Sequence, residues 1–487
     1  MNSSSSGKPE LGTKAFAWLV ATLVGFGVCG VVLLDTVAAS RTAWTFGGVT
    51  LATPPQYALS GLLAAGLLIL FAVLKYGAFV SRHRFAIMVG VIMLSSHLMA
   101  IGRGPLTPLA FAILVLLALW VLEHLTNPDA TWIPSGFVML VFLFFLTIIA
   151  SMLGGRPFSV FADVLATSLK LLLAVMLVDI LRTRDMVRRG VWMMLVAAAV
   201  GALAGVLQSI LFYGFGIELS LAEHDYRYAH APFGTVLRAT GFSRFANQFA
   251  PPLVIAALVS AALCLSGGMR KWRWGLGVVA LLCTLAVVAS MARGAWLALL
   301  IGLVLLPLVA RPHRATLWLG VGIPVLLAAW LAGPIPWALK KLHGLSESGL
   351  IERGMLLSAG LKTMAAHPLN GVGVGNFGPY SPTLERHPVH NAMLQVGSEL
   401  GVFGLLIYIT IFVWVGAQLV IALRAADDPL RKAELRALLS GLLGLLIVIQ
   451  AEPMGYSQFV WIYLALAESM ARVGKIETPD KRGIRAT

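Results

Sequence analysis

The sequence predicts an all-α, polytopic integral membrane protein. Of its 487 residues, 59% are hydrophobic and only 12% are charged, whereas about a quarter of the residues of an ordinary soluble domain are charged. Apolar runs recur from residue 15 almost to the end of the chain, and a bilayer needs roughly 20 apolar residues per helix. Because these runs lack the alternation of polar and apolar residues found in membrane β-barrels, helices are the expected spanning elements.

Fourteen apolar runs are candidate spans, and twelve remain if the shorter ones are re-entrant or fused, so we expect about 12 to 14 transmembrane helices. The first run has no small-residue cleavage site and many spans follow it, so we interpret it as a retained helix rather than a signal peptide. The candidate spans lie near residues 15–34, 56–76, 85–102, 106–123, 132–152, 158–181, 190–213, 249–267, 275–291, 295–310, 316–333, 400–423, 437–451 and 457–471.

The distribution of Lys and Arg predicts the orientation of the chain. With a cytoplasmic N-terminus, most of the 36 basic residues fall on cytoplasmic connections, as the positive-inside rule expects. We therefore predict cytoplasmic tails at 1–14 and 473–487 and a transmembrane domain over 15–472. The net charge of +15 is then explained by topology and by attraction to anionic lipid headgroups, and nucleic acid binding is not indicated.

The three cysteines all lie inside apolar runs, without the spacing of a metal site or a disulfide framework. They are expected to be small buried residues. They are Cys29, Cys264 and Cys283.

Two outer connections, 214–248 and 334–399, are far longer than the others, and long connections of this kind usually carry function. In the second, residues 350–366 have the spacing of an amphipathic helix that lies along the membrane surface. Its apolar positions are Leu350, Met355, Leu357, Leu361 and Met364.

The stretch GVGVGNFG at 371–378 is similar to a glycine-rich nucleotide loop. No strand precedes it and no Walker lysine follows it, so a nucleotide site is disfavoured. A tight turn with positive backbone φ angles is the favoured interpretation, and close approach of the backbone to a ligand is the alternative.

The stretch PVHNAMLQVGSELGVFG at 388–404 places a histidine and an asparagine before an apolar run. If a helix begins near Pro388, then His390, Gly397, Gly401 and Gly404 share one stripe at about 100° per residue, and the glycines let a neighbouring helix approach. His390 at a helix N-terminus would be kept neutral, as a general base must be. The alternative is that His390 and Asn391 only cap an interfacial helix.

Two arginines lie unusually close to the predicted hydrocarbon region. Arg293 falls in the outer turn between two spans, and Arg238 just precedes a re-entering helix. A cation there is costly unless it faces a cavity or an anion, although snorkelling to lipid headgroups is a common alternative. Together with His390, these residues suggest a shared site on the outer face.

At these residues the sequence resembles the O-antigen ligase and O-antigen polymerase superfamily of bacterial inner membranes. The ligase signature is a His, then Asn, Ser or Gln, nine residues, a Gly, two residues, and Gly, Thr or Tyr; here His390, Asn391, Gly401 and Gly404 match it without departure. The surrounding pattern is also similar, over about residues 236–405. It comprises Arg238 before ATGF, Arg293 in ARGAW, Arg353 before AAHPLNGVGVGNF, and Glu399 ahead of Gly401. One departure is SRFANQFA, where many relatives have a shorter turn, and this leaves the role of Asn247 open.

The resemblance implies a GT-C-like glycosyltransferase that moves a glycan from undecaprenyl diphosphate to the lipid A core at the periplasmic face, which completes lipopolysaccharide. Glycosyltransferases often recruit a metal through paired carboxylates, but the outer segments contain no DxD motif, so we expect neither a metal nor another cofactor. We assign the donor diphosphate to Arg238 and Arg293, with Arg353 as a third candidate, because guanidinium groups bind phosphate oxygens bidentately.

His390 is the expected general base, which deprotonates the acceptor hydroxyl in a single inverting displacement. Asn391, Glu399 and Gly401 are expected to support the site. Glu399 lies nine residues from His390, about 180° around a regular helix, so we expect it to pair with another outer-face group rather than to orient the histidine ring.

The alternatives are an O-antigen polymerase or a protein O-oligosaccharyltransferase, which would share the donor and differ in the acceptor. Outside this class, the alternative is a polytopic transporter, whose polar residues would lie at mid-membrane in broken helices of related halves.

Overall fold

The fold is all-α, as the composition predicts. The computed structural model describes residues 135–152, 161–218, 228–231, 234–243, 245–310, 352–382 and 388–476, with positions 45–46 and 49–50 and six positions between 113 and 124. Within these residues, the strands form two short antiparallel hairpins, β1 (Thr45–Phe46) with β2 (Val49–Thr50) and β3 (Tyr228–Ala231) with β4 (Gly234–Leu237). Every long element is a helix.

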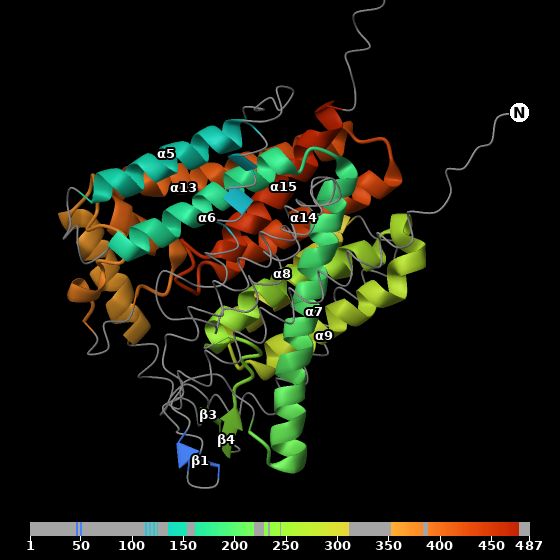
Figure 1. Cartoon of the computed structure of the whole chain (residues 1–487), viewed down its shortest axis with the longest axis horizontal. Coiled ribbons are helices and arrows are strands. Elements are labelled where there is room, and N and C mark those ends of the chain that lie inside the picture. The colour runs from blue at the N-terminus through green and yellow to red at the C-terminus, as the bar shows by residue number, and fades with distance from the viewer. Residues whose placement is uncertain are drawn as a thin grey trace, which may run out of the picture.

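The described helices follow one another between residues 136 and 476, and Figure 1 labels those from α5 to α9 and from α13 to α15. They are α5 (Gly136–Ser151), α6 (Phe161–Ile180), α7 (Arg184–Phe215), α8 (Ala246–Leu265), η2 (Gly267–Trp272), α9 (Arg273–Ala289), α10 (Arg293–Ala310), a helix over 352–366, η3 (Gly378–Tyr380), α13 (Ala392–Ala425), α14 (Pro429–Val448) and α15 (Gln458–Ile476).

Each predicted span within the described ranges coincides with one of these helices. Four of the helices, α7, α8, α13 and the segment Met269–Ala289, are long and apolar enough to cross a membrane. The starts of α13 and α14 come eight residues earlier than predicted, because their first turns are capped by polar residues that an apolar window leaves out. The spans predicted at 15–34, 56–76, 85–102 and 316–333 lie outside the described residues, and of 106–123 only five positions, all helical, are described.

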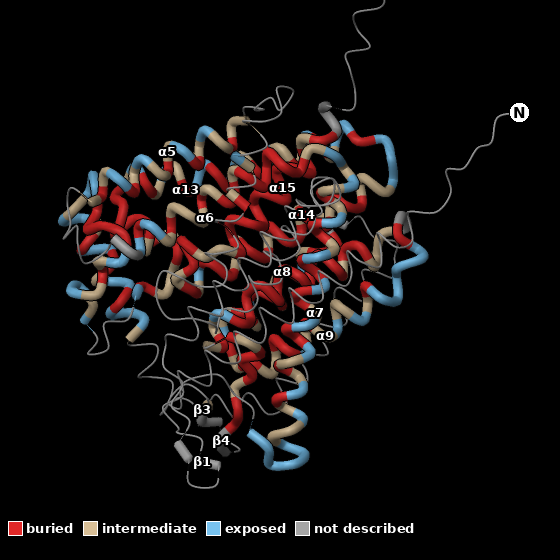
Figure 2. Tube along the Cα trace, viewed as in Figure 1, coloured by how far each residue is buried: buried red, intermediate tan, exposed pale blue. Residues whose placement is uncertain are grey.

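The core lies where α8, α14 and α15 meet, and Figure 2 shows buried residues gathered along them. In the same bundle, α13 packs against α5, and α6 packs against α15. On the periphery, α7 and α9 expose large apolar side chains such as Val196, Leu203 and Leu281. Exposed apolar surface over whole helices is expected where a protein contacts lipid, so this pattern agrees with a membrane protein.

Helix α13 is interrupted at Gly401, whose φ of 74° and ψ of −172° are not helical. The segment 368–373 inserts at this break. The Val402 amide donates to the Pro368 carbonyl (2.7 Å), and the Gly373 amide donates to the Glu399 carbonyl (2.8 Å). The predicted stripe of Gly397, Gly401 and Gly404 is therefore wrong, because the interruption ends the regular helical spacing. Gly397 does face a neighbouring helix, since a Cβ added there would lie 2.7 Å from the Met364 sulfur.

Gly401→Ala should lower the free energy of unfolding by at least about 3 kcal/mol, because these dihedral angles are accessible essentially to glycine alone. An added Cβ would also overlap the Leu369 carbonyl. Melting of the purified protein in detergent tests this. Gly416→Ala is the matched control within the same helix, where an added Cβ meets Leu442 at an ordinary 3.5 Å, and it should be neutral or slightly stabilising. Equal melting temperatures for the two variants would contradict the proposed constraint.

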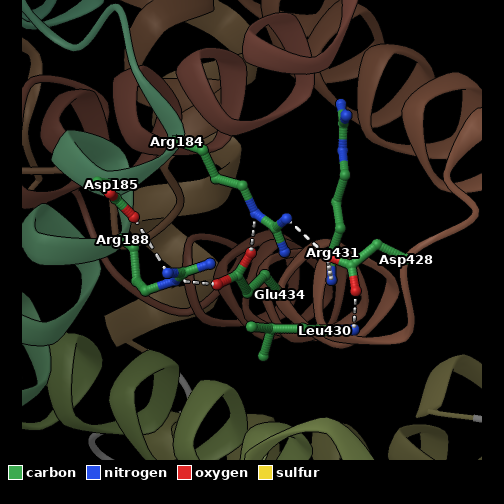
Figure 3. Close-up of polar contacts among 7 residues, drawn as sticks. All are labelled: Arg184, Asp185, Arg188, Asp428, Leu430, Arg431 and Glu434. Carbon is green, nitrogen blue, oxygen red and sulfur yellow. Dashed lines mark hydrogen bonds and ion pairs between the residues drawn. The ribbon is translucent and has the colours of Figure 1, made fainter. Parts of the chain in front are cut away.

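An ion-pair cluster joins α7 to the beginning of α14 (Figure 3). The buried Glu434 carboxylate accepts from Arg184 Nε (3.0 Å) and Arg188 Nε (2.5 Å), and Arg184 also reaches Asp428 (2.6 Å). Arg184 and Arg188 belong to the basic cluster of residues 182–189, and Asp428 and Glu434 lie within the basic cluster of residues 424–436. They lie at the end of α14 opposite its C-terminus at Val448, a separation of about 30 Å for a helix of this length.

Glu434→Gln should lower the free energy of unfolding by about 3 kcal/mol, because two partly buried guanidinium groups lose their shared carboxylate. Asp185→Asn is the control: it removes an exposed partner of Arg188 within α7 and should cost less than about 1 kcal/mol. Melting in detergent at low and high salt measures both. A Glu434 variant as stable as the control would show that the cluster contributes nothing to holding α7 on α14.

Candidate active site

The candidate site is organised around Glu452, in the turn between α14 and α15. Its side chain is 4% exposed, and its Oε2 atom lies 3.7 Å from Nδ1 of His390, whose side chain is 25% exposed. Glu452 also interacts electrostatically with Arg238. A carboxylate in this position can orient an imidazole ring and stabilise its protonated form.

His390 is positioned by the two residues that follow it in the chain. Asn391 is the N-cap of α13: its Oδ1 accepts from the Leu394 amide (2.9 Å), and its Nδ2 donates to the Gln450 carbonyl (3.2 Å) and side chain (3.1 Å). The Ala392 amide donates to the Ile449 carbonyl (2.8 Å). These contacts fasten the start of α13 to the turn that carries Glu452.

The predicted start of this helix at Pro388 is wrong. Asn391, a preferred N-cap residue, begins the helix at Ala392, so His390 lies ahead of the cap. His390 therefore lies outside the first turn of α13, where the sequence had placed it. Glu452 is the charged neighbour that the structure gives this ring.

Arg238 follows β4 and is oriented by two acceptors. Its Nη2 donates to Asn247 Oδ1 (2.8 Å), and its Nε donates to the Ser290 carbonyl (3.4 Å). Burial lowers the pKa of Arg238 from its ordinary value, nearby Glu452 raises it, and Arg293 lowers it. The guanidinium stays charged. Glu452 attracts this charge and Arg293 repels it, so the site favours binding of an anion.

Arg293 is the first residue of α10 and is exposed. The turn before it contains Met291 with a φ of 54°, a left-handed conformation that is uncommon for residues other than glycine. The first turn of α10 packs on the Glu452 turn, since a Cβ added at Gly294 would lie 2.5 Å from Ala451 Cβ and 3.8 Å from Glu452 Oε1. The structure thus brings together His390, Arg238 and Arg293 from three distant segments.

Arg353 is not joined to this group. It is exposed in the first turn of the helix over 352–366, and no hydrogen bond or ion pair links it to His390, Arg238 or Arg293 among the described residues. This helix is present as predicted, but its buried face is Leu356, Gly360 and Thr363. Leu357 and Leu361, two of the predicted apolar positions, are about half exposed, at 48% and 51%, which leaves them available to the membrane surface.

Glu399 and the glycine-rich turn lie together at the interruption of α13. The buried Glu399 carboxyl faces the Gly375 amide and the Tyr456 hydroxyl, which agrees with the expectation that it does not orient His390. Three glycines of the turn, Gly371, Gly373 and Gly375, have positive φ. A side chain at Gly371 would overlap the Glu399 backbone. The stretch is therefore a tight turn with positive φ angles, as predicted, and it packs against α13.

Sequence reasoning missed Glu452, although one signal was present. It is the acidic residue of QAEPMGYS, the short turn between the last two apolar runs, and a carboxylate so close to hydrocarbon needs a partner. The structure also gives Asn247 a role that the sequence left open, as an acceptor for Arg238. In the described part of the chain, no three His, Cys, Asp or Glu side chains are grouped as metal ligands.

Comparison with known proteins supports the resemblance drawn from the sequence. Residues 278–409 match a family model described as O-antigen ligase; the segment contains Arg293, Arg353 and His390, whereas Arg238 and Glu452 lie outside it. No curated protein matches the chain. A chain from a solved peptidoglycan synthase complex is similar at 15% identity and a TM-score of 0.40, covering 71% of this chain and 98% of that chain.

Proposed function

We propose, from the membership of residues 278–409 in the O-antigen ligase family, that this membrane protein transfers a glycan from undecaprenyl diphosphate to the lipid A core. The reaction takes place at the periplasmic face of the bacterial inner membrane, with both termini in the cytoplasm. The observation that carries the proposal is the position of Glu452, between a histidine and two arginines that come from distant parts of the chain.

His390 acts as the general base. Its Nδ1 lies 3.7 Å from the Glu452 carboxylate; in this scheme Nδ1 carries the proton of the neutral ring, and Nε2 takes the proton of the acceptor hydroxyl. As the imidazolium forms, the carboxylate stabilises its charge. The acceptor oxygen bonds to the anomeric carbon while the bond from that carbon to the diphosphate oxygen breaks, and the configuration inverts.

Arg238 and Arg293 receive the leaving group. Negative charge develops on the diphosphate as the glycosidic bond breaks, and fixed cations placed there lower the barrier. Asn247 and the Ser290 carbonyl leave Arg238 with further N–H donors for phosphate oxygens, because a guanidinium has five. We assign Arg353 no contact in this scheme, and its exposed position allows it to interact with lipid headgroups.

Reconstitution of the purified protein with undecaprenyl diphosphate glycan and lipid A core tests the proposal. Glycan joined to the lipid A core, with transfer preserved in the presence of a chelator, is the expected result. Glycan joined to a second donor glycan, or to a protein, would instead identify a polymerase or a protein O-oligosaccharyltransferase. Glycan flux across sealed vesicles without bond formation would identify a transporter. Loss of transfer on chelation would refute the metal-independent scheme.

Arg293→Lys should lower kcat/KM for the donor by about tenfold or more, although the positive charge is retained, because lysine lacks the planar fork that binds two phosphate oxygens. The transfer assay with varied donor concentration measures this. Arg270→Lys is the matched control, since Arg270 is an exposed arginine of η2, and it should leave the rate unchanged. Full activity of the Arg293 variant would point to headgroup snorkelling instead.

A further inference from the structure

Helix α7 holds the segment that carries Arg238 at two points. One residue before the arginine, the Leu237 amide donates to the Tyr213 hydroxyl (3.0 Å). Two and three residues after it, the Thr240 amide (3.0 Å) and the Gly241 amide (2.9 Å) both donate to Gln208 Oε1. The Gln208 Nε2 returns a hydrogen bond to the Gly241 carbonyl (2.9 Å). We call Gln208 and Tyr213 the α7 bracket.

The Gln208 contacts are specific to a primary amide. The side chain is buried at 8% exposure, and it satisfies two amides and one carbonyl of the loop with one acceptor and one donor. An apolar residue of the same size would leave all three backbone groups without these partners in a buried place, which is costly. Near Gln208, α7 also makes room for the loop at Gly205, where an added Cβ would overlap Phe249 and lie 3.6 Å from Ala239 Cβ.

The opposite side of the same segment contacts the turn that leads to Arg293. The Ala239 amide donates to the Ala289 carbonyl (3.0 Å), and Arg238 Nε donates to the Ser290 carbonyl. The segment 237–241 is therefore held between α7 and the α9–α10 turn. The α7 bracket therefore influences the distance between the Arg238 guanidinium and Arg293. A diphosphate bound by both arginines has to match that distance.

We propose that Gln208 and Tyr213 are positioning residues for recognition of the donor diphosphate, acting only through the backbone on either side of Arg238. The inference rests on the proposed function, since it assumes that Arg238 binds diphosphate. It adds two residues from a helix that contributes none of the groups assigned to the reaction.

The test compares Gln208→Leu with Gln208→Glu, Tyr213→Phe and the control Ser209→Ala, whose hydroxyl bonds only within α7. Gln208→Leu should lower kcat/KM for the donor by about 10²-fold, the effect expected of a displacement near 1 Å, with the KM for the acceptor unchanged. Gln208→Glu keeps the acceptor oxygen, so its kcat/KM for the donor should lie between the values of the wild type and Gln208→Leu. Tyr213→Phe loses one hydrogen bond at an exposed helix end, so it should fold normally. Its kcat/KM for the donor should fall about fivefold.

A second experiment asks whether the bracket acts through Arg238. In the Arg238→Ala background, Gln208→Leu should cause less than about a twofold further loss, because coupled residues are non-additive. Equal losses in both backgrounds, or a wild-type donor KM in Gln208→Leu, would overturn the proposal. Hydrogen exchange at the Thr240 and Gly241 amides should accelerate in Gln208→Leu and not in Ser209→Ala.

Binding of farnesyl diphosphate and farnesyl monophosphate in detergent separates this proposal from the proposed function. If the wild-type protein transfers no glycan but prefers the diphosphate, and Gln208→Leu removes that preference, the bracket stands and the transferase assignment fails. If the wild-type protein shows no preference for the diphosphate, or Gln208→Leu keeps it, the bracket proposal fails whatever the transfer assay shows.

Discussion

His390→Ala should lower the rate of glycan transfer by about 10²- to 10⁴-fold, the usual contribution of a general base. The variant should remain folded, because the ring is partly exposed and lies outside the hydrophobic core. The bonds that fasten α13 to the Glu452 turn come from Asn391 and from the Ala392 backbone, so they survive the substitution. Transfer in the reconstituted system, with melting in detergent as a measure of folding, tests this.

His367→Ala is the matched control for this variant. His367 lies just after the helix over 352–366, and its ring contacts Tyr380 edge to face; among the described residues its side chain makes no hydrogen bond or ion pair with the groups assigned to the reaction. It should keep a near-normal rate. His390→Gln separates hydrogen bonding from proton transfer, since glutamine retains polar atoms but cannot accept the proton. A near-normal rate in either His390 variant would refute the general base assignment.

The helices were predictable because the bilayer imposes one strong constraint. A span must be long, apolar and internally hydrogen-bonded, and those properties are readable from α8 or α13 without any tertiary information. The ends of the helices were less predictable, because polar capping residues lie outside the apolar runs from which the spans were predicted. At α13, two local preferences compete: proline favours the first turn at 388 and asparagine favours the cap position at 391. The asparagine prevails because its side chain also bonds Gln450, a contact between distant segments.

Part of the site was predictable for a similar reason. His390, Arg238 and Arg293 stand out as polar groups at the ends of apolar runs, where their cost demands an explanation. Glu452 obeys the same rule, but it follows His390 by 62 positions, and only the packing of the α14–α15 turn on the start of α13 brings the two together. Arg353 is the opposite case. The sequence pattern grouped it with Arg238 and Arg293, but the structure shows no contact between it and those arginines among the described residues.

The two ends of α14 differ in how their charged residues are paired. Arg184 and Arg188 pair with Glu434 at one end of α14, whereas at the other end, among the residues that the structure describes, Glu452 interacts with both His390 and Arg238, and Arg293 lies near Arg238. The first group is internally compensated, so it stabilises the fold. Within the described residues, the second group holds two guanidinium groups and one carboxylate, which suits it to an anionic substrate.

Glu452→Gln should lower kcat by roughly 10²-fold or more, because the ring of His390 loses the group that orients it and stabilises its protonated form. The KM for the donor should stay the same or fall. Without the carboxylate, Arg238 and Arg293 are less compensated and attract the diphosphate more strongly. This opposite movement of kcat and donor affinity is not expected from a variant that is merely unstable.

Steady-state transfer rates at varied donor concentration measure both quantities. Glu218→Gln is the control, because Glu218 is an exposed acid just beyond α7 that accepts from Tyr228, and its loss should leave both quantities within about twofold of the wild-type values. Glu452→Asp shortens the side chain by one methylene while keeping the charge, so it should recover part of kcat. A higher donor KM with an unchanged kcat in Glu452→Gln would show that the carboxylate only organises the arginines. In that case His390 would act as a base without help from Glu452.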